Sequence, residues 1–273
     1  MIRSVILTLA CLLISMASMA QLPDIDAVLN EMVEVYGGEQ NLGKMDRMVQ
    51  EWALVALVGN RHGTDLRSVN LPMQLKVELT YPDKTETRIL NGANGFTIFG
   101  DHPAQAAATP QRDAMMLQLM RMYSPLALRN FKNVIKLSDN GSEYVLTLSA
   151  HGVVSEYFVN KESRRIERVA GTLKINGNLM SFVTVYSDFK IVDGVLVHQR
   201  EDKYAGTVNT AQLQLRRIEF DASFGQGYFD PPDKAQDSLI TAGAIRMIAP
   251  PVMPGLGLAR TAEDLESGHG AAW

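Results

Sequence analysis

Turn dipeptides of the Asn-Gly and Asp-Gly type recur along the chain and constrain its fold more than any other feature. They are Asn91-Gly92, Asn94-Gly95, Asn140-Gly141, Asn176-Gly177 and Asp193-Gly194. These residue types accept the positive φ angles that tight β-hairpins require. Hairpins join neighbouring antiparallel strands, whereas parallel strands need long crossover connections. The pattern therefore predicts a meander of antiparallel strands.

Strand-like runs, rich in β-branched and aromatic residues, lie between these turns. They are residues 49–58, 71–81, 84–90, 96–100, 134–138, 143–150, 153–160, 166–175, 179–191, 195–204 and 208–220. We therefore expect about eleven strands and a mainly β (α+β) fold. The run 179–191 would extend about 40 Å at ~3.4 Å per residue. A twisted sheet of such strands has to curl or close.

In the last run, residues 208–220, the alternation of apolar side chains changes phase partway along the strand. Leu213 and Leu215 point to one face of a regular strand, whereas Ile218 and Phe220 would point to the other. One extra residue restores a common face. A β-bulge is therefore predicted near Arg216-Arg217.

Two segments have helical rather than strand spacing. Residues 26–36 repeat apolar side chains every three or four positions, with Asp24 or Asp26 available as a cap and Gly37-Gly38 as a stop. Residues 113–123, with the sequence DAMMLQLMRMY, contain four methionines. Both segments are predicted to be helices.

The first twenty residues have the anatomy of a signal peptide. A positive start at Arg3 precedes an apolar run through residue 14, and Ser18-Met19-Ala20 offers small residues for cleavage. We expect export to the periplasm and cleavage after Ala20. A lipoprotein anchored at Cys11 is the alternative, but it would leave an apolar run after the cut. Residues 21–232 form the expected domain, and 233–273 an irregular C-terminal appendage.

Motifs for catalysis or for cofactors are weak. The formal net charge of −4 argues against a nucleic-acid surface. The five histidines show no metal-ligand spacing, and Cys11 is the chain's one cysteine. Asp101-His102 could recruit a distant serine, but no nucleophile-elbow motif accompanies it. We expect no enzyme activity, no cofactor and no bound metal.

The methionine-rich helix has two open interpretations. Its narrow polar stripe consists of Gln111, Ala114, Gln118 and Arg121, and the remainder of its surface is apolar. Such a helix has to be covered on more than one side. All its apolar residues could pack in the core, or one flank could border a ligand cavity, for which methionine is well suited. The cavity interpretation assigns the wall to Met115, Met116, Leu119, Met120 and Tyr123.

Several motifs, in their order along residues 24–232, resemble those of the outer-membrane lipoprotein-sorting superfamily, the LolA-like periplasmic carriers and their mycobacterial lipid-binding relatives. They are Tyr36-Gly37-Gly38, Tyr81-Pro82-Asp83-Lys84 before Arg88, NGANGF over 91–96, YSDFKIVDGV over 186–195 and Phe229-Asp230-Pro231-Pro232. Three features depart from the pattern: Phe96 replaces a common Trp, Val197-His198 replaces a common proline, and the tail beyond Pro232 is additional.

The resemblance implies an unclosed antiparallel half-barrel of about eleven strands, wrapped around short helices and binding acyl chains inside. The expected function is therefore a non-catalytic periplasmic carrier of a lipid or a lipoprotein acyl chain, with a possible membrane-protein partner in the envelope. A second hypothesis is an interaction module of an envelope complex that docks through residues 233–273. A hydrolase using Asp101-His102 ranks last.

Overall fold

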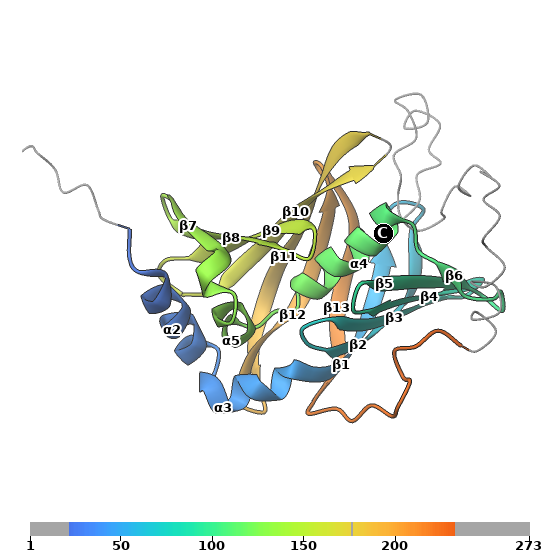
Figure 1. Ribbon diagram of the computed structural model, residues 1–273, viewed down its shortest axis with the longest axis horizontal. Coiled ribbons are helices and arrows are strands. Elements are labelled where there is room, and N and C mark those ends of the chain that lie inside the picture. The colour runs from blue at the N-terminus through green and yellow to red at the C-terminus, as the bar shows by residue number, and fades with distance from the viewer. Residues whose placement is uncertain (1–21, 176, 233–273) are drawn as a thin grey trace, which may run out of the picture.

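The computed structural model describes residues 22–175 and 177–232, and these residues form one curved antiparallel sheet with a few short helices (Figure 1). The thirteen strands are β1 (Arg47–Ala56), β2 (Arg61–Asn70), β3 (Gln74–Tyr81), β4 (Lys84–Asn91), β5 (Asn94–Phe99), β6 (Gln105–Ala106), β7 (Ile135–Asn140), β8 (Glu143–Ala150), β9 (Val153–Asn160), β10 (Ile166–Ile175), β11 (Asn178–Val192), β12 (Val195–Ala205) and β13 (Val208–Phe220). The predicted mainly β fold class is confirmed.

The strand order is β6-β5-β4-β3-β2-β1-β13-β12-β11-β10-β9-β8-β7. Every neighbouring pair is antiparallel, and only β1 and β13 are neighbours without being consecutive. The two ends of the meander therefore meet in the middle of the sheet. β6 and β7 lie at opposite edges, so the sheet is an unclosed half-barrel, as expected.

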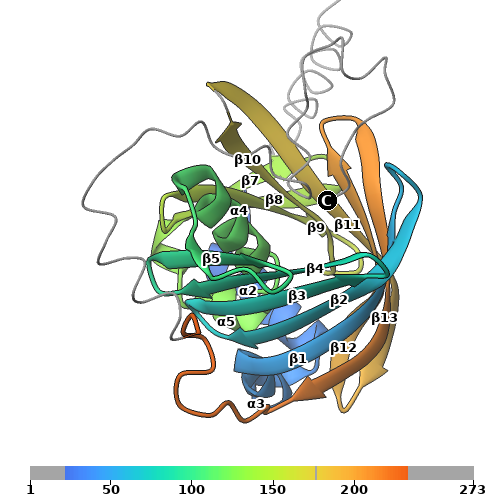
Figure 2. The ribbon, with the colours of Figure 1, turned by 90° about the vertical axis from the view of Figure 1, so that its right-hand side faces the viewer.

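The segment between the two edge strands carries the helices that cross the open side. It contains α4 (Thr109–Met120) and α5 (Pro125–Arg129). α4 contacts β3, β4 and β5 on one arm of the sheet and β9 and β10 on the other. Figure 2 shows the sheet curling around α4 and the other helices. At the other end of the concave side, α2 (Ile25–Val35) packs against α5 and α3 (Gly38–Leu42).

Most sequence-based boundaries agree with the structure. The four strands β8, β9, β10 and β13 have the predicted bounds. β2 and β6 were not predicted, so eleven strands were two too few. The Asn94-Gly95 turn was also wrong, because both residues belong to β5. Gly95 lies against the side chains of Ala107 and Arg112, so close packing rather than a turn accounts for this glycine.

The predicted β-bulge in β13 is confirmed. Glu51 of β1 pairs with Arg217, but the next residue, Trp52, pairs with Leu215, so Arg216 is the extra residue. Leu213 and Leu215 are buried, and Ile218 and Phe220 pack partly buried against the same core. The bulge thus restores a common inward face across the phase change.

The predicted N-terminal helix is also confirmed, and it is fastened to the hairpin between β11 and β12. Asp24 caps α2 by accepting a hydrogen bond from the Asp26 N–H at 3.1 Å. Beyond the helix, the Leu196 N–H donates to the carbonyl of Tyr36 at 3.0 Å. A Cβ atom on Gly37 would lie 2.0 Å from the carbonyl oxygen of Gly194. Two glycines are therefore needed where these backbones meet.

A valine at Gly194 is expected to destabilise the protein by more than about 1 kcal/mol, because β-branched residues tolerate positive φ poorly. Gly194 has φ 83°, and a Cβ there would approach Asn41 Nδ2 to 2.8 Å. Gly152→Val is the matched control, since Gly152 has φ 85° but a Cβ atom there would meet no other atom within 4 Å. Urea midpoints should rank Gly194→Val as the less stable variant. Equal midpoints would mean that the contact with Asn41 is unimportant.

The segment after β13 returns over the convex face. Phe229 is buried with Ile89 and Phe96, and Phe224 and Tyr228 pack around them. The Tyr228 hydroxyl lies 2.9 Å from the Ser68 hydroxyl. The segment with the Phe-Asp-Pro-Pro motif therefore covers an apolar patch of β4 and β5. The expected signal peptide (1–20) and appendage (233–273) lie outside the described residues.

Candidate functional site

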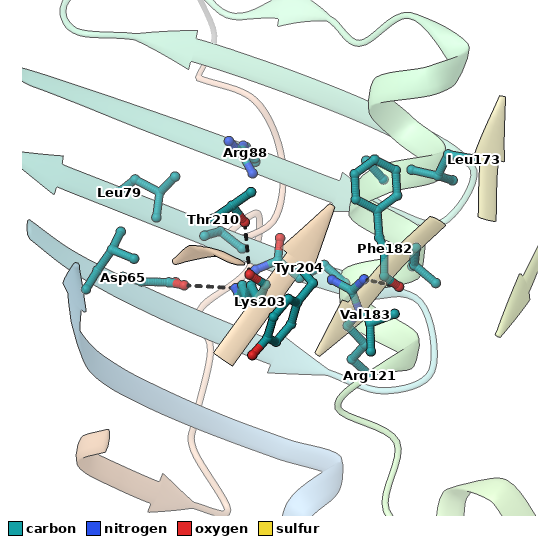
Figure 3. A pocket seen from close by; sticks show the side chains of 15 residues that line it. Asp65, Leu79, Arg88, Arg121, Leu173, Phe182, Val183, Lys203, Tyr204 and Thr210 are labelled. Carbon is teal, nitrogen blue, oxygen red and sulfur yellow. Dashed lines mark hydrogen bonds and ion pairs between the residues drawn. The ribbon is translucent and has the colours of Figure 1, made fainter. Parts of the chain in front are cut away.

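A cavity of about 60 Å³ lies between α4 and the concave face of the sheet (Figure 3). Its apolar lining comes from the four strands β1, β3, β10 and β11 and from α4: Leu54, Val77, Leu79, Ala114, Leu117, Leu173, Phe182 and Val183. Its polar and charged lining consists of Asp65, Arg88, Gln118, Arg121, Lys203, Tyr204 and Thr210. The cavity is therefore apolar over much of its wall but contains several charged side chains.

Close packing and two tyrosines hold α4 over this cavity. A Cβ atom on Gly171 of β10 would lie 2.2 Å from Leu117 Cδ1, so the helix sits directly on the strand there. At the C-terminal end of α4, the Tyr157 hydroxyl donates to the Met120 carbonyl at 2.8 Å. The Tyr186 hydroxyl donates to the Arg121 carbonyl at 3.1 Å. The sheet thus satisfies carbonyls that every helix leaves without an internal partner.

The structure places the expected wall residues in the core. Met115, Met116, Leu119, Met120 and Tyr123 are all buried. They do not line the cavity described above, whose helical wall is Ala114, Leu117, Gln118 and Arg121. Their burial agrees with the expectation that the helix is covered on more than one side. Contact between these five residues and a lipid stays a prediction.

A buried ion network lies beside the cavity. The Arg67 guanidinium donates to both carboxylate oxygens of Glu201 at 2.8 and 2.9 Å. It also donates to Asp65, with a shortest distance of 2.8 Å. Burial alone would lower the pKa of Arg67, but the two carboxylates raise it above its ordinary value. Burial would likewise raise the pKa of Glu201, but Arg67 and Lys203 hold it well below the usual range.

Aromatic rings enclose this network. The Arg67 guanidinium lies 5.0 Å from the Trp52 ring centre. His198 stacks between Trp52 and Tyr186, with ring centroids at 5.5 and 4.1 Å. His198 Nε2 lies 3.2 Å from Glu201 Oε1. His198, which departs from the proline of the resembled family, is therefore a packed member of the network.

Three cations line the cavity itself: Arg88, Arg121 and Lys203. Lys203 Nζ lies 3.8 Å from Asp65 Oδ2 and 3.7 Å from Glu201 Oε2. Burial, reinforced by Arg67, lowers the pKa of Lys203 to about 8. The Arg121 guanidinium donates a long hydrogen bond to the Phe182 carbonyl at 3.3 Å. Burial lowers the pKa of Arg121 as well.

The Asp101-His102 motif lies at the surface. Asp101 and His102 are exposed in the turn after β5. Within the part of the chain that the structure describes, no group of three or more His, Cys, Asp or Glu residues is arranged to hold a metal ion. In the same residues, no helix has the length and apolarity needed to cross a membrane.

Asp65 and Arg67 were not predicted as site residues because β2 was not predicted as a strand. In that strand Asp65 and Arg67 occupy the inward phase, where apolar residues are expected. Such a run resembles a polar loop. A signal was available in β12, where Val195, Val197, Glu201 and Lys203 share one phase. Charged residues in phase with buried valines predict charges that point inward.

Comparisons with known proteins agree with this architecture. No family matches the sequence, and no curated protein sequence is significantly similar to it. Among solved structures, a LolA superfamily protein from Nitrosomonas europaea has a TM-score of 0.50 and 12% identity, covering 76% of this chain and 98% of the other. This likeness confirms the expected resemblance at the level of the fold.

Two other solved structures are similar at lower scores. A putative outer membrane lipoprotein-sorting protein domain from Vibrio parahaemolyticus has a TM-score of 0.45 and 9% identity over 74% of this chain and 97% of the other. A DUF1329 family protein from Desulfovibrio piger has a TM-score of 0.48 and 11% identity over 77% of this chain and 98% of the other.

Proposed function

We propose that this protein is a periplasmic carrier that binds the acyl chain of a lipid or lipoprotein between the concave sheet and α4, without catalysing a reaction. The observation that supports this most is the position of α4, which crosses the open side of the half-barrel and closes a largely apolar cavity. The fold shared with a LolA superfamily protein supports the same function.

The size of the cavity indicates that α4 has to move when an acyl chain enters. Its volume of about 60 Å³ is well below the roughly 300 Å³ at which ligand pockets begin. Burying ten CH₂ groups would contribute about 8 kcal/mol. That gain can offset the loss of part of the packing between α4 and the sheet. The small cavity volume supports the interpretation of this conformation as a closed form of the proposed carrier.

The N-terminal end of α4 is the more exposed end of the helix. Thr109 and Pro110 are exposed, whereas Leu119 and Met120 are buried. The tyrosine hydrogen bonds to Met120 and Arg121 fasten the C-terminal end. We therefore place the hinge after Met120 and the opening between α4 and β5, which would break the hydrogen bond from the Ala107 N–H to the Gly95 carbonyl at 2.8 Å.

A disulfide between α4 and β5 is expected to block lipid uptake. A Cβ atom on Gly95 would lie 3.3 Å from the Cβ atom of Arg112, near the Cβ separation of about 3.5–4.5 Å found in disulfides. The double variant Gly95→Cys/Arg112→Cys, in a Cys11→Ser background, should bind a fluorescent fatty acid only after reduction. Displacement of the bound probe by unlabelled fatty acid would measure this.

The single variants Gly95→Cys and Arg112→Cys control for the side-chain changes and should bind with or without reductant. Uptake by the oxidised double variant, with the disulfide verified by mass, would contradict opening at this end. If the wild-type protein binds no lipid probe, and organic extracts of protein purified from its native envelope contain no lipid, the carrier proposal fails. The interaction module that docks through residues 233–273 would then be favoured.

A further inference from the structure

Arg121 differs from the other arginines at the cavity because it has no carboxylate partner among the described residues. Arg67 is paired with Asp65 and Glu201, and Arg88 with Glu86 at 2.6 Å. Arg121 forms no ion pair in that part of the chain, and its Nε is buried without a hydrogen-bond partner. Its guanidinium donates instead to the Phe182 carbonyl at 3.3 Å. Figure 3 shows it beside Phe182 and Val183 in the cavity wall.

The charges around Arg121 leave the cavity positive. The cations that line it or lie directly behind it are Arg67, Arg88, Arg121 and Lys203, and the carboxylates paired with them are Asp65, Glu86 and Glu201. One positive charge is thus not compensated. Burial is the main cause that lowers the pKa of Lys203 to about 8, and the neighbouring Arg67 and Arg121 lower it further.

A partly buried guanidinium without a carboxylate is unfavourable, because charges removed from water need a partner. Arg121 is the C-cap residue of α4, and the apolar side chains of Leu54, Val77 and Leu117 line the same cavity. The site therefore combines an unpaired cation with apolar surface. This is the chemistry that recognises an amphiphile with a negative head group.

We propose that Arg121 binds the anionic head group, a carboxylate or a phosphate, of an amphiphile whose acyl chain lies along the apolar wall of the cavity. This rests on the proposed carrier function and specifies its ligand class. The guanidinium fork suits either head group, since both accept two parallel hydrogen bonds. The present cavity volume of about 60 Å³ is enough for such a head group, whereas the chain enters as α4 opens.

The test compares ligands with the same chain and different head groups. Binding of dodecanoate, dodecyl phosphate and dodecanol to the full chain is measured by displacement of a neutral fluorescent probe. Wild-type protein should prefer at least one of the two anions over dodecanol by about ten- to hundredfold, the range typical of hydrogen bonds to charged groups. The better anion distinguishes a carboxylate from a phosphate ligand.

Arg121→Met should remove this preference by weakening anion binding while leaving dodecanol binding unchanged. Arg217→Met is the control, because it removes the same charge from a side chain that is 60% exposed and does not line the cavity. It should keep the preference. Without ligand, Arg121→Met should have an unfolding temperature equal to or above that of the wild type, because it removes a partly buried charge that has no carboxylate partner among the described residues.

The outcomes separate the two proposals. Equal binding of all three ligands by the wild type, or an unchanged preference in Arg121→Met, would overturn the head-group role while leaving the carrier function standing. Binding of none of them would overturn both. A marked fall in the unfolding temperature of ligand-free Arg121→Met, with the preference retained, would show that Arg121 has a purely structural role.

Discussion

Replacing Arg67 with methionine is expected to lower the free energy of unfolding by about 3–5 kcal/mol, the typical cost of removing one partner from a buried ion pair. The side chains of Arg67, Asp65 and Glu201 are only 2%, 2% and 6% exposed. Without the guanidinium, the two carboxylates keep their charge but lose the donor that both share. Urea unfolding at neutral pH measures the loss.

The control is an arginine of the same sheet at its surface. Arg217 lies 3.8 Å from Glu51, and the two side chains are 60% and 41% exposed. Exposed pairs of this kind contribute about 0–1 kcal/mol, so Arg217→Met should change the urea midpoint little. Similar shifts of the urea midpoint in the two variants would show that the buried Arg67 network contributes no more to stability than an exposed ion pair does.

The pH dependence of Arg67→Met should have the opposite sign to that of the wild type. In the wild type the pKa of Glu201 lies well below its ordinary value of 4.5. Its stabilising contribution is therefore complete above about pH 4.5 and is lost as pH falls through the lowered pKa. In the variant, the carboxyl group of Glu201 loses Arg67, the charge that most lowers its pKa, while burial still raises that pKa. The folded variant then binds more protons than the unfolded chain. Its free energy of unfolding should therefore increase as the pH falls from 7 to about 5.

The double variant Met116→Ala/Met120→Ala is expected to lose several kcal/mol of stability. Met116 is 4% exposed and Met120 is fully buried. Removing a large side chain at such sites typically costs about 2–5 kcal/mol each, because a space remains that the core does not refill. The two residues are one helical turn apart, so their effects need not add. Urea midpoints and displacement of a fluorescent fatty acid should be measured together.

Gln118→Ala is the control, because Gln118 belongs to the same helix but lines the cavity. Its effect on stability should be below about 1 kcal/mol, as its side chain is only partly packed. A small loss of stability in the methionine double variant, together with altered lipid uptake, would instead support a methionine wall. Met120→Glu would decide the matter, since a charge in a lipid-contacting wall should abolish acyl binding in a protein that stays folded.

The sequence by itself determined the parts of the fold that depend on local geometry. Asp193 and Gly194 both have positive φ, 48° and 83°, and only a few residue types adopt such angles without strain. Strand alternation gave β8 and β9 their bounds, and the phase change in β13 located the bulge at Arg216. Each of these features depends on residues close together in the chain, so it leaves a readable pattern.

The tertiary structure alone decided which face of α4 meets the cavity. The sequence showed that this helix had to be covered on several sides, but it left open whether the flank of Met116 and Met120 packs in the core or borders a cavity. The structure buries that flank and presents Leu117, Gln118 and Arg121 to the cavity between α4 and the sheet. The two arms of the sheet enclose the helix by pairing segments far apart in the chain, so no local pattern identifies the face.

The same holds for the charges inside the half-barrel. Arg67 and Glu201 are 134 residues apart in the chain and bind each other across the concave face. Each looks like a surface residue in its own strand, because a charged side chain is usually hydrated. Only the β1–β13 pairing, which joins the two ends of the meander, brings β2 and β12 close enough for their charges to compensate one another. The curvature of the whole sheet brings each charged side chain close to the partner of opposite charge that offsets the cost of its burial.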